Sequence, residues 1–117
     1  MQPIPKVSRA DVGRIVERDY PPTLRRQVLE IIDSYDPAGR EPQRSRVQLA
    51  ALKLAAGNVN ELRRHVDAAS RDFRDVIASA EYPAAARQRP SSRGDETEQQ
   101  HVYDADWEQY RAWLERA

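Results

Sequence analysis

The sequence predicts an all-α protein with about five to six helices, arranged as antiparallel pairs in one small domain. Apolar residues recur at intervals of three and four along most of its 117 residues, which is the period of helices with one buried face. Residues that cap helix N-termini precede several of these segments, and prolines or glycines follow them. These three observations agree on the fold class.

The first two helices are expected at 9–19 and 23–35. Ser8 begins the sequence S-x-x-D, a variant of the capping box in which a hydroxyl satisfies a free backbone N–H. Two prolines follow the first helix and block its continuation. The turn sequence D-P-A-G follows the second, because proline stops a helix and glycine accepts a positive φ.

The next two helices are expected at 43–56 and 58–80, on either side of a tight corner. Apolar residues cover more than half of the circumference of the first, so we expect it to be central and contacted from two sides. Gly57 suits the left-handed end of one helix, and Asn58 begins the capping sequence N-x-x-E of the other. A break near Ser70 is left open, because serine is also a good helix cap.

The sequence pattern divides the chain into three parts: a helical body at 1–83, a polar linker at 84–100 and a final helix at 101–117. The linker lacks apolar periodicity. Each large apolar side chain left in water costs about 1.5–3 kcal/mol, so the aromatic side chains of the final helix must be buried. They pack either on the body or in a groove of a partner, and the partner is another protein or a second copy of the chain. The candidate partner-binding residues are Trp107, Tyr110, Trp113 and Leu114.

Composition excludes several classes of protein. The chain has no cysteine, which rules out disulfides, thiolate metal sites and a cysteine nucleophile. Its two histidines are far apart in sequence, and we expect neither a metal nor any other cofactor. Nothing approaches the roughly 18 apolar residues of a membrane span. No secretory signal is recognisable, and we expect a bacterial cytoplasmic location.

Charge is unevenly distributed along the chain. Residues 1–94 carry 17 basic and 12 acidic side chains, whereas residues 95–117 carry 2 basic and 7 acidic ones. A net charge of +5 on residues 1–94 is too weak to predict nucleic-acid binding by itself. Binding of nucleic acid through exposed arginines is therefore kept only as an alternative. The arginines in question are Arg25, Arg26, Arg63 and Arg64.

The corner around Gly57 resembles two known motifs without matching either. A DNA-binding helix-turn-helix normally has a small residue four positions before the glycine and an aliphatic residue about six after it, where this chain has Lys53 and Arg63. Residues 51–62 resemble the second loop of ubiquitin-associated domains. The upstream signature of those domains is missing, and a glycine at a helix corner explains the likeness, which we interpret as coincidental.

No catalytic or metal-binding group emerges from the remaining polar residues. His65 is the only group of the body that titrates near neutrality, and with Arg63 and Arg64 it forms an alternative polar surface on the helix at 58–80. Asp104, Asp106 and Glu108 lack the glycine and distal glutamate of a calcium loop. We therefore expect a protein that is not an enzyme.

Four stretches carry a resemblance to a family of small, uncharacterised bacterial helical proteins. They are IIDSYD (31–36), RVQLAALKLAAGN (46–58), DFRDVIASAEYP (72–83) and DADWEQYRAWLERA (104–117). The resemblance implies an all-helical fold, with an α-α superhelix of the armadillo/HEAT kind as the expected arrangement. It implies no activity. The predicted function is a non-enzymatic module that binds another protein or a second copy of itself, without a membrane.

Overall fold

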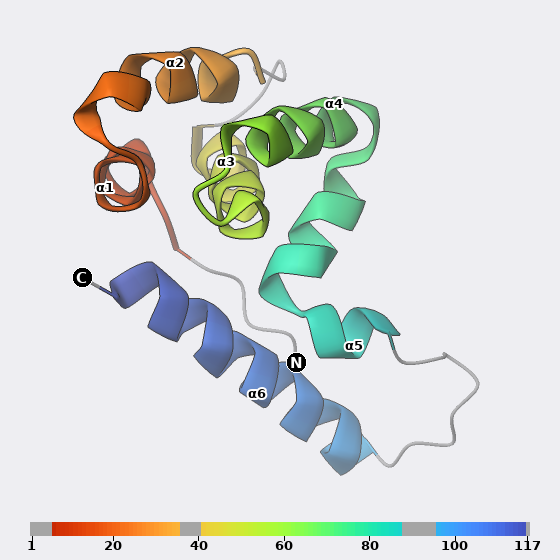
Figure 1. Ribbon diagram of the computed structural model, residues 1–117. Coiled ribbons are helices and arrows are strands. Elements are labelled where there is room, and N and C mark those ends of the chain that lie inside the picture. Colours follow the sequence, from red (N-terminus) through yellow and green to blue (C-terminus); the bar gives the residue numbers. More distant parts are fainter. Residues whose placement is uncertain (1–5, 36–40, 88–95, 117) are drawn as a thin grey trace.

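The structure is a computed structural model that describes residues 6–35, 41–87 and 96–116. Within these ranges it contains α-helices and their connections and no strand, so the predicted fold class is confirmed (Figure 1). The helices are α1 (Arg9–Asp19), α2 (Pro22–Asp33), α3 (Glu41–Ala55), α4 (Val59–Glu81), α5 (Pro83–Arg87) and α6 (Glu96–Glu115).

Local sequence sets the ends of the first helices. The backbone N–H of Ser8 donates to the Asp11 carboxylate at 3.0 Å, which is one half of the predicted capping arrangement. α1 ends at Asp19, and Pro22 occupies the first turn of α2, where its missing N–H is harmless. The predicted turn at 36–39 lies outside the described residues.

The corner between α3 and α4 has the predicted backbone. Ala56 and Gly57 have φ angles of 51° and 83°, in the left-handed region that favours glycine. A Cβ atom on Gly57 would lie 3.3 Å from the carbonyl oxygen of Asp19, so the corner also packs closely on the end of α1. The Asn58 side chain accepts a hydrogen bond from the backbone N–H of Glu61 at 2.9 Å, which confirms it as the cap of α4.

α4 is bent within its length, and its two halves run in different directions in Figure 1. The break lies at Asp72, whose φ of −153° and ψ of 96° are not helical. The Asp72 carboxylate accepts the backbone N–H of Arg74 at 3.1 Å and so caps the second half. Ser70 does not cap it, because its hydroxyl donates back to the Val66 carbonyl at 3.1 Å.

The core forms around α3, which packs most extensively on α4 and next on α1. This central position agrees with its broad apolar surface, and the three-four pattern of 58–80 faces it. Burial of each large aliphatic side chain contributes about 1.5–3 kcal/mol. The main buried side chains are Val12, Ile15 and Val16 of α1, Val28 and Ile32 of α2, Val47, Leu49 and Leu52 of α3, and Leu62 and Val66 of α4.

One polar side chain of the core, Gln48 of α3, connects three helices. Its amide nitrogen donates to the Ile32 carbonyl at 3.1 Å, and its amide oxygen accepts from the Arg9 guanidinium at 3.3 Å. Arg9 also forms an ion pair with Asp33 at 2.9 Å. The Ile32 carbonyl, in the last turn of α2, also accepts the backbone N–H of Tyr35 at 3.1 Å, so Gln48 is a second donor to it.

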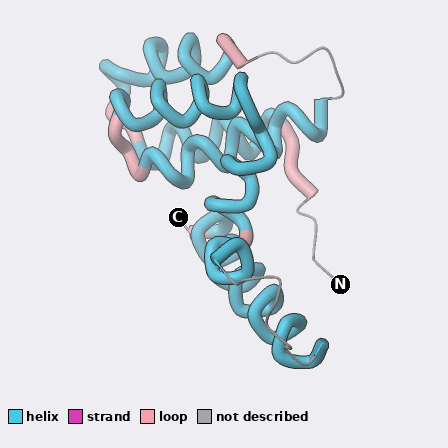
Figure 2. The backbone as a smooth tube through the Cα atoms, turned by 90° about the vertical axis from the view of Figure 1, so that its right-hand side faces the viewer, coloured by secondary structure: helices cyan, strands magenta, loops and turns pink. Residues whose placement is uncertain are grey.

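The stretch expected as a linker at 84–100 is partly helical. α5 covers its beginning, α6 already starts at Glu96, and 88–95 lie outside the described residues. α5 forms because Asp106 of α6 accepts the backbone N–H groups of Ala84 and Ala85, at 3.3 and 2.9 Å. Figure 2 shows that the C-terminal half of α6 lies beside the body, whereas its N-terminal half projects beyond it.

Candidate functional site

The apolar side chains assigned from sequence to partner binding lie on α6, against the chain's own body. Tyr110 is fully buried, and Trp113 and Leu114 pack on the core. Trp107 is half-buried and stacks on Tyr110, with ring centroids 6.3 Å apart. α6 thus uses within the chain most of the apolar surface that a partner would need. The assignment of these side chains to a partner stays a prediction.

Arg18 of α1 holds the C-terminal end of α6. Its guanidinium donates to the backbone carbonyls of Trp113 and Arg116 at 2.6 and 2.8 Å. The last carbonyls of a helix generally lack donors within that helix, so the arginine acts as a cap at the end of α6. The same guanidinium lies 5.3 Å from the centre of the Trp113 ring, and Asp19 pairs with it at 2.8 Å.

A buried ion pair between α3 and α4 lies in the region where α6 contacts the body. Arg46 of α3 donates two hydrogen bonds to the Glu81 carboxylate at 2.7 and 2.8 Å, and only 3% of the Glu81 side chain is exposed. The Tyr110 hydroxyl is buried and makes no hydrogen bond within the part of the chain that the structure describes. Burial, and secondarily the Glu81 charge, raises the pKa of Tyr110 far above its ordinary value of 10.

Asp106 is the second buried carboxylate of this region, and it lies near Lys53 of α3. Burial lowers the pKa of Lys53, and the charge of Asp106 only partly opposes that effect. We call the contact of α6 with the body the α6 junction. It comprises Arg18, Arg46, Lys53, Glu81, Asp106 and Tyr110.

Asp104, Asp106 and Glu108 of α6 do not converge on one point. Asp106 is turned inward to α5, whereas Asp104 accepts from the Gln100 amide at 2.9 Å and Glu108 lies 4.0 Å from Arg111. In the described part of the chain, no group of three or more potential ligands is placed to hold a metal ion.

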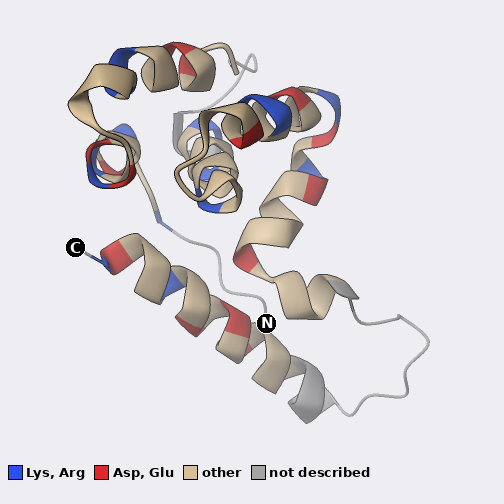
Figure 3. Cartoon of the chain, in the orientation of Figure 1, with Lys and Arg blue, Asp and Glu red and all other residues tan. Residues whose placement is uncertain are grey.

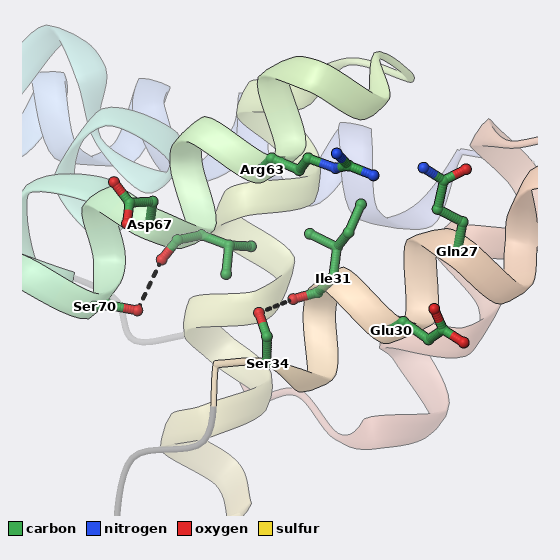
Figure 4. A pocket seen from close by; sticks show the side chains of 8 residues that line it. Gln27, Glu30, Ile31, Ser34, Arg63, Asp67 and Ser70 are labelled. Carbon is green, nitrogen blue, oxygen red and sulfur yellow. Dashed lines mark hydrogen bonds between the residues drawn. The ribbon is translucent and has the colours of Figure 1, made fainter.

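Of the alternative polar surface of Arg63, Arg64 and His65, the last two lie beside the same carboxylate and the first points elsewhere. Arg64 pairs with Glu61 at 2.7 Å, and the His65 Nε2 atom lies 3.6 Å from the same carboxylate. Burial, followed by the charge of Arg64, lowers the pKa of His65. Arg63 instead extends toward α2, where sequence analysis gave it no neighbour (Figure 4).

A groove of about 440 Å³ separates α2 from the first half of α4 (Figure 4). This volume is in the range of ligand sites in proteins. Ile31 provides most of its accessible apolar surface, because Val66, which also lines the groove, is only 5% exposed. Polar side chains surround both residues. The α2–α4 groove is lined by Gln27, Glu30, Ile31 and Ser34 of α2 and by Arg63, Val66, Asp67 and Ser70 of α4.

Most polar groups of the α2–α4 groove already have partners. The Ser34 hydroxyl donates to the Ile31 carbonyl at 2.5 Å, Asp67 pairs with Arg71, and Glu30 lies 3.6 Å from Arg26. Ser70, too, is bonded within its own helix.

Gln27 and Arg63 are the exception among these polar groups. Both side chains are exposed and have no hydrogen-bond or ion-pair partner within the described ranges. They face each other across one end of the groove (Figure 4).

Sequence analysis missed this groove, although part of the pattern was visible. The groove residues of each helix recur at intervals of three and four, as the residues of one helical face must. Nothing in the sequence indicated that these two faces meet. A second cavity of about 420 Å³ lies at the far end of α4, lined by Leu54, Asp75, Ala78, Ser79, Pro83 and Ala86.

No family model, curated protein or solved structure matches the chain. The armadillo/HEAT arrangement implied by the sequence resemblance therefore stays a prediction, while the all-helical fold itself is established. Among the helices that the structure describes, none is both long and apolar enough to cross a lipid bilayer.

Proposed function

We propose that the chain is a non-enzymatic helical module that binds a segment of another protein in the α2–α4 groove. The observation that carries this proposal is the contrast between that groove and the aromatic helix. The groove keeps an apolar surface and two unpartnered polar side chains, Gln27 and Arg63. The aromatic helix has its most apolar residues packed on the body. Kinship with small bacterial helical proteins and a cytoplasmic location remain predictions from sequence.

The shape of the groove favours a helical segment as its occupant. Two helices side by side present parallel ridges, and a third helix is able to lay its apolar side chains between them. Ile31 supplies the accessible apolar contact from α2, and the nearly buried Val66 lines the wall formed by α4. A helix in a groove is also a common mode of peptide recognition in which a few anchor residues dominate the affinity.

The exposed arginines give little support to nucleic-acid binding as the alternative. Figure 3 shows basic and acidic residues alternating along α4. Three of its arginines pair with carboxylates of the same helix, namely Arg64 with Glu61, Arg71 with Asp67 and Arg74 with Asp72. Phosphates would have to displace these carboxylates, so such binding would be weak and strongly salt-dependent.

His65 likewise gives little support to an enzymatic function. Its only ion-pair partner in the described part of the chain is the Glu61 carboxylate, and it is not among the residues that line the α2–α4 groove. A catalytic base needs a substrate site within reach of its nitrogen.

A displayed library of helical peptides, selected on the full chain, tests the proposal. Selected peptides should lose binding when Ser70→Trp fills the groove, and Ser34→Trp should act in the same way from the opposite wall. The matched control is Ser79→Trp, an exposed serine on the second half of the same helix and outside the groove. Thermal unfolding of all three variants shows that they fold.

Two results would overturn the proposal. One is a selection that yields no peptide binding the wild-type chain above background. The other is a set of peptides whose affinity is unchanged by both groove substitutions, or falls equally with Ser79→Trp.

A further inference from the structure

We infer that the segment bound in the α2–α4 groove carries a single carboxylate, received by Arg63 and Gln27, one helical turn away from an aliphatic side chain that packs on Ile31 and Val66. This inference rests on the proposed function and specifies the chemistry of its partner. It follows from how the charges around the groove are distributed and from the spacing of the groove residues.

Arg63 is left without a partner for a local reason. A carboxylate four residues ahead, Asp67, is close enough on the helix to pair with it. Asp67 pairs instead with Arg71, in the order acid-before-base that suits the helix dipole better. Arg64 on the other side of Arg63 takes Glu61. The Arg63 guanidinium therefore keeps all its donors for a group that enters the groove.

The opposite wall offers no carboxylate to Arg63 either. Glu30 lies near Arg26 on its own helix, 3.6 Å apart, and Figure 4 shows it pointing away from Arg63. The side chain that does face Arg63 is Gln27, whose amide is also unpartnered. An acceptor placed between the two side chains receives hydrogen bonds from both, and a carboxylate is the acceptor that guanidinium geometry fits best.

The spacing along both helices sets the distance between the charge and the apolar contact. Ile31 follows Gln27 by four residues, and Val66 follows Arg63 by three, so each apolar residue lies about one helical turn, 5.4 Å, from the polar one. An occupant helix matches this arrangement when its acidic and aliphatic residues are three or four positions apart.

The other end of the groove disfavours a second carboxylate on the occupant. Ser34 and Ser70 are small, and their hydroxyls are bonded to their own helices. Asp67 and Glu30, the carboxylates of the two walls, already lie beside arginines of their own helices. A second carboxylate there finds no free donor among the described side chains, whereas a neutral polar or aliphatic side chain fits.

Two synthetic helical peptides of about 16 residues test the inference directly. Both carry leucine with an acidic position four residues away, and they differ only in having Glu or Gln at that position. Their affinities for the full chain are measured by fluorescence anisotropy. The Glu peptide should bind about three- to tenfold more tightly than the Gln peptide. Rising salt should reduce this advantage, because the pair lies at the surface.

The matched substitutions are Arg63→Gln and Arg64→Gln, which remove neighbouring arginines of the same helix. Arg63→Gln should abolish the preference for Glu, and Arg64→Gln should leave it intact, because Arg64 is already paired outside the groove. Gln27→Ala should reduce the preference without abolishing it.

The outcomes separate this inference from the proposed function. Equal binding of both peptides, with affinity lost in Ser70→Trp, overturns the carboxylate inference and leaves the groove as a binding site. A preference for Glu that survives Arg63→Gln, or no binding of the Glu peptide at all, also overturns it. The proposed function falls only with the library result described above.

Discussion

The α6 junction and the α2–α4 groove are both contacts between helices that combine apolar and polar side chains. They differ most in their guanidinium and carboxylate groups, which all have partners at the junction, whereas the groove leaves Arg63 without one among the described residues. At the junction, Glu81 binds Arg46 and Asp106 binds two backbone N–H groups, all within the chain. In the groove, Gln27 and Arg63 have none within the described ranges. A satisfied polar contact fixes one arrangement of helices, whereas unpartnered donors at a surface are available to a ligand. We therefore expect substitutions at the junction to change stability and substitutions in the groove to change binding.

The largest effect is expected for Tyr110→Ala at the α6 junction. Loss of a fully buried aromatic ring leaves a cavity under α6 and should lower the free energy of unfolding by about 3–5 kcal/mol. Urea denaturation followed by circular dichroism measures this change. The control is Tyr110→Phe, which should change stability by less than about 0.5 kcal/mol because the lost hydroxyl makes no hydrogen bond. A loss below 1 kcal/mol for the alanine variant would show that α6 contributes little to the fold.

Glu81→Gln should have the next largest effect. It leaves the Arg46 charge in a mostly buried position without its carboxylate, which should cost about 3 kcal/mol in the same assay. Glu108→Gln is the matched control on α6, where the carboxylate is exposed and 4.0 Å from its arginine, and it should be nearly neutral. Similar losses for the two variants would contradict the importance of the buried pair.

Lys53→Met should raise stability at neutral pH slightly, by less than about 1 kcal/mol. Burial of the ammonium outweighs its attraction to Asp106, but the side chain is only half-buried and solvent screens its charge. The folded-state pKa of Lys53 lies below its ordinary value of 10.5, so the unfolded chain binds more protons between these two values. The free energy of unfolding of the wild-type chain should therefore increase relative to that of the variant as the pH rises through this window. Urea midpoints of both proteins at neutral and alkaline pH measure the difference in stability between them. Both proteins contain the same tyrosines, so tyrosine titration cancels from this difference. A constant difference would be evidence against the burial of this charge.

The smallest stability effect is expected in the α2–α4 groove. Arg63→Gln and Gln27→Ala remove side chains without partners in the described structure, so each should change the free energy of unfolding by less than about 0.5 kcal/mol. Both variants should nevertheless weaken binding of the Glu peptide. A loss above 1 kcal/mol for either variant would mean that the side chain holds the two helices together, and the contrast between the two regions would disappear.

Sequence by itself determined the helices of the body. Periodicity, Ser8, Asn58 and the prolines placed α1 to α4 to within two residues of their observed ends, because caps and breakers act over one helical turn. It also identified Gly57 as a corner, since the positive φ there is a local requirement.

Only the tertiary structure decided the contacts between residues far apart in sequence. The cap of α5 comes from Asp106 about twenty residues later, and the amide of Gln48 on α3 donates to a carbonyl at the end of α2. Neither contact is visible in a local pattern. The same holds for the α2–α4 groove, because helical spacing defines the face that contains Arg63 but not the face opposite it. Helix propensity and capping depend on neighbours in the chain, whereas a binding surface depends on how finished helices pack.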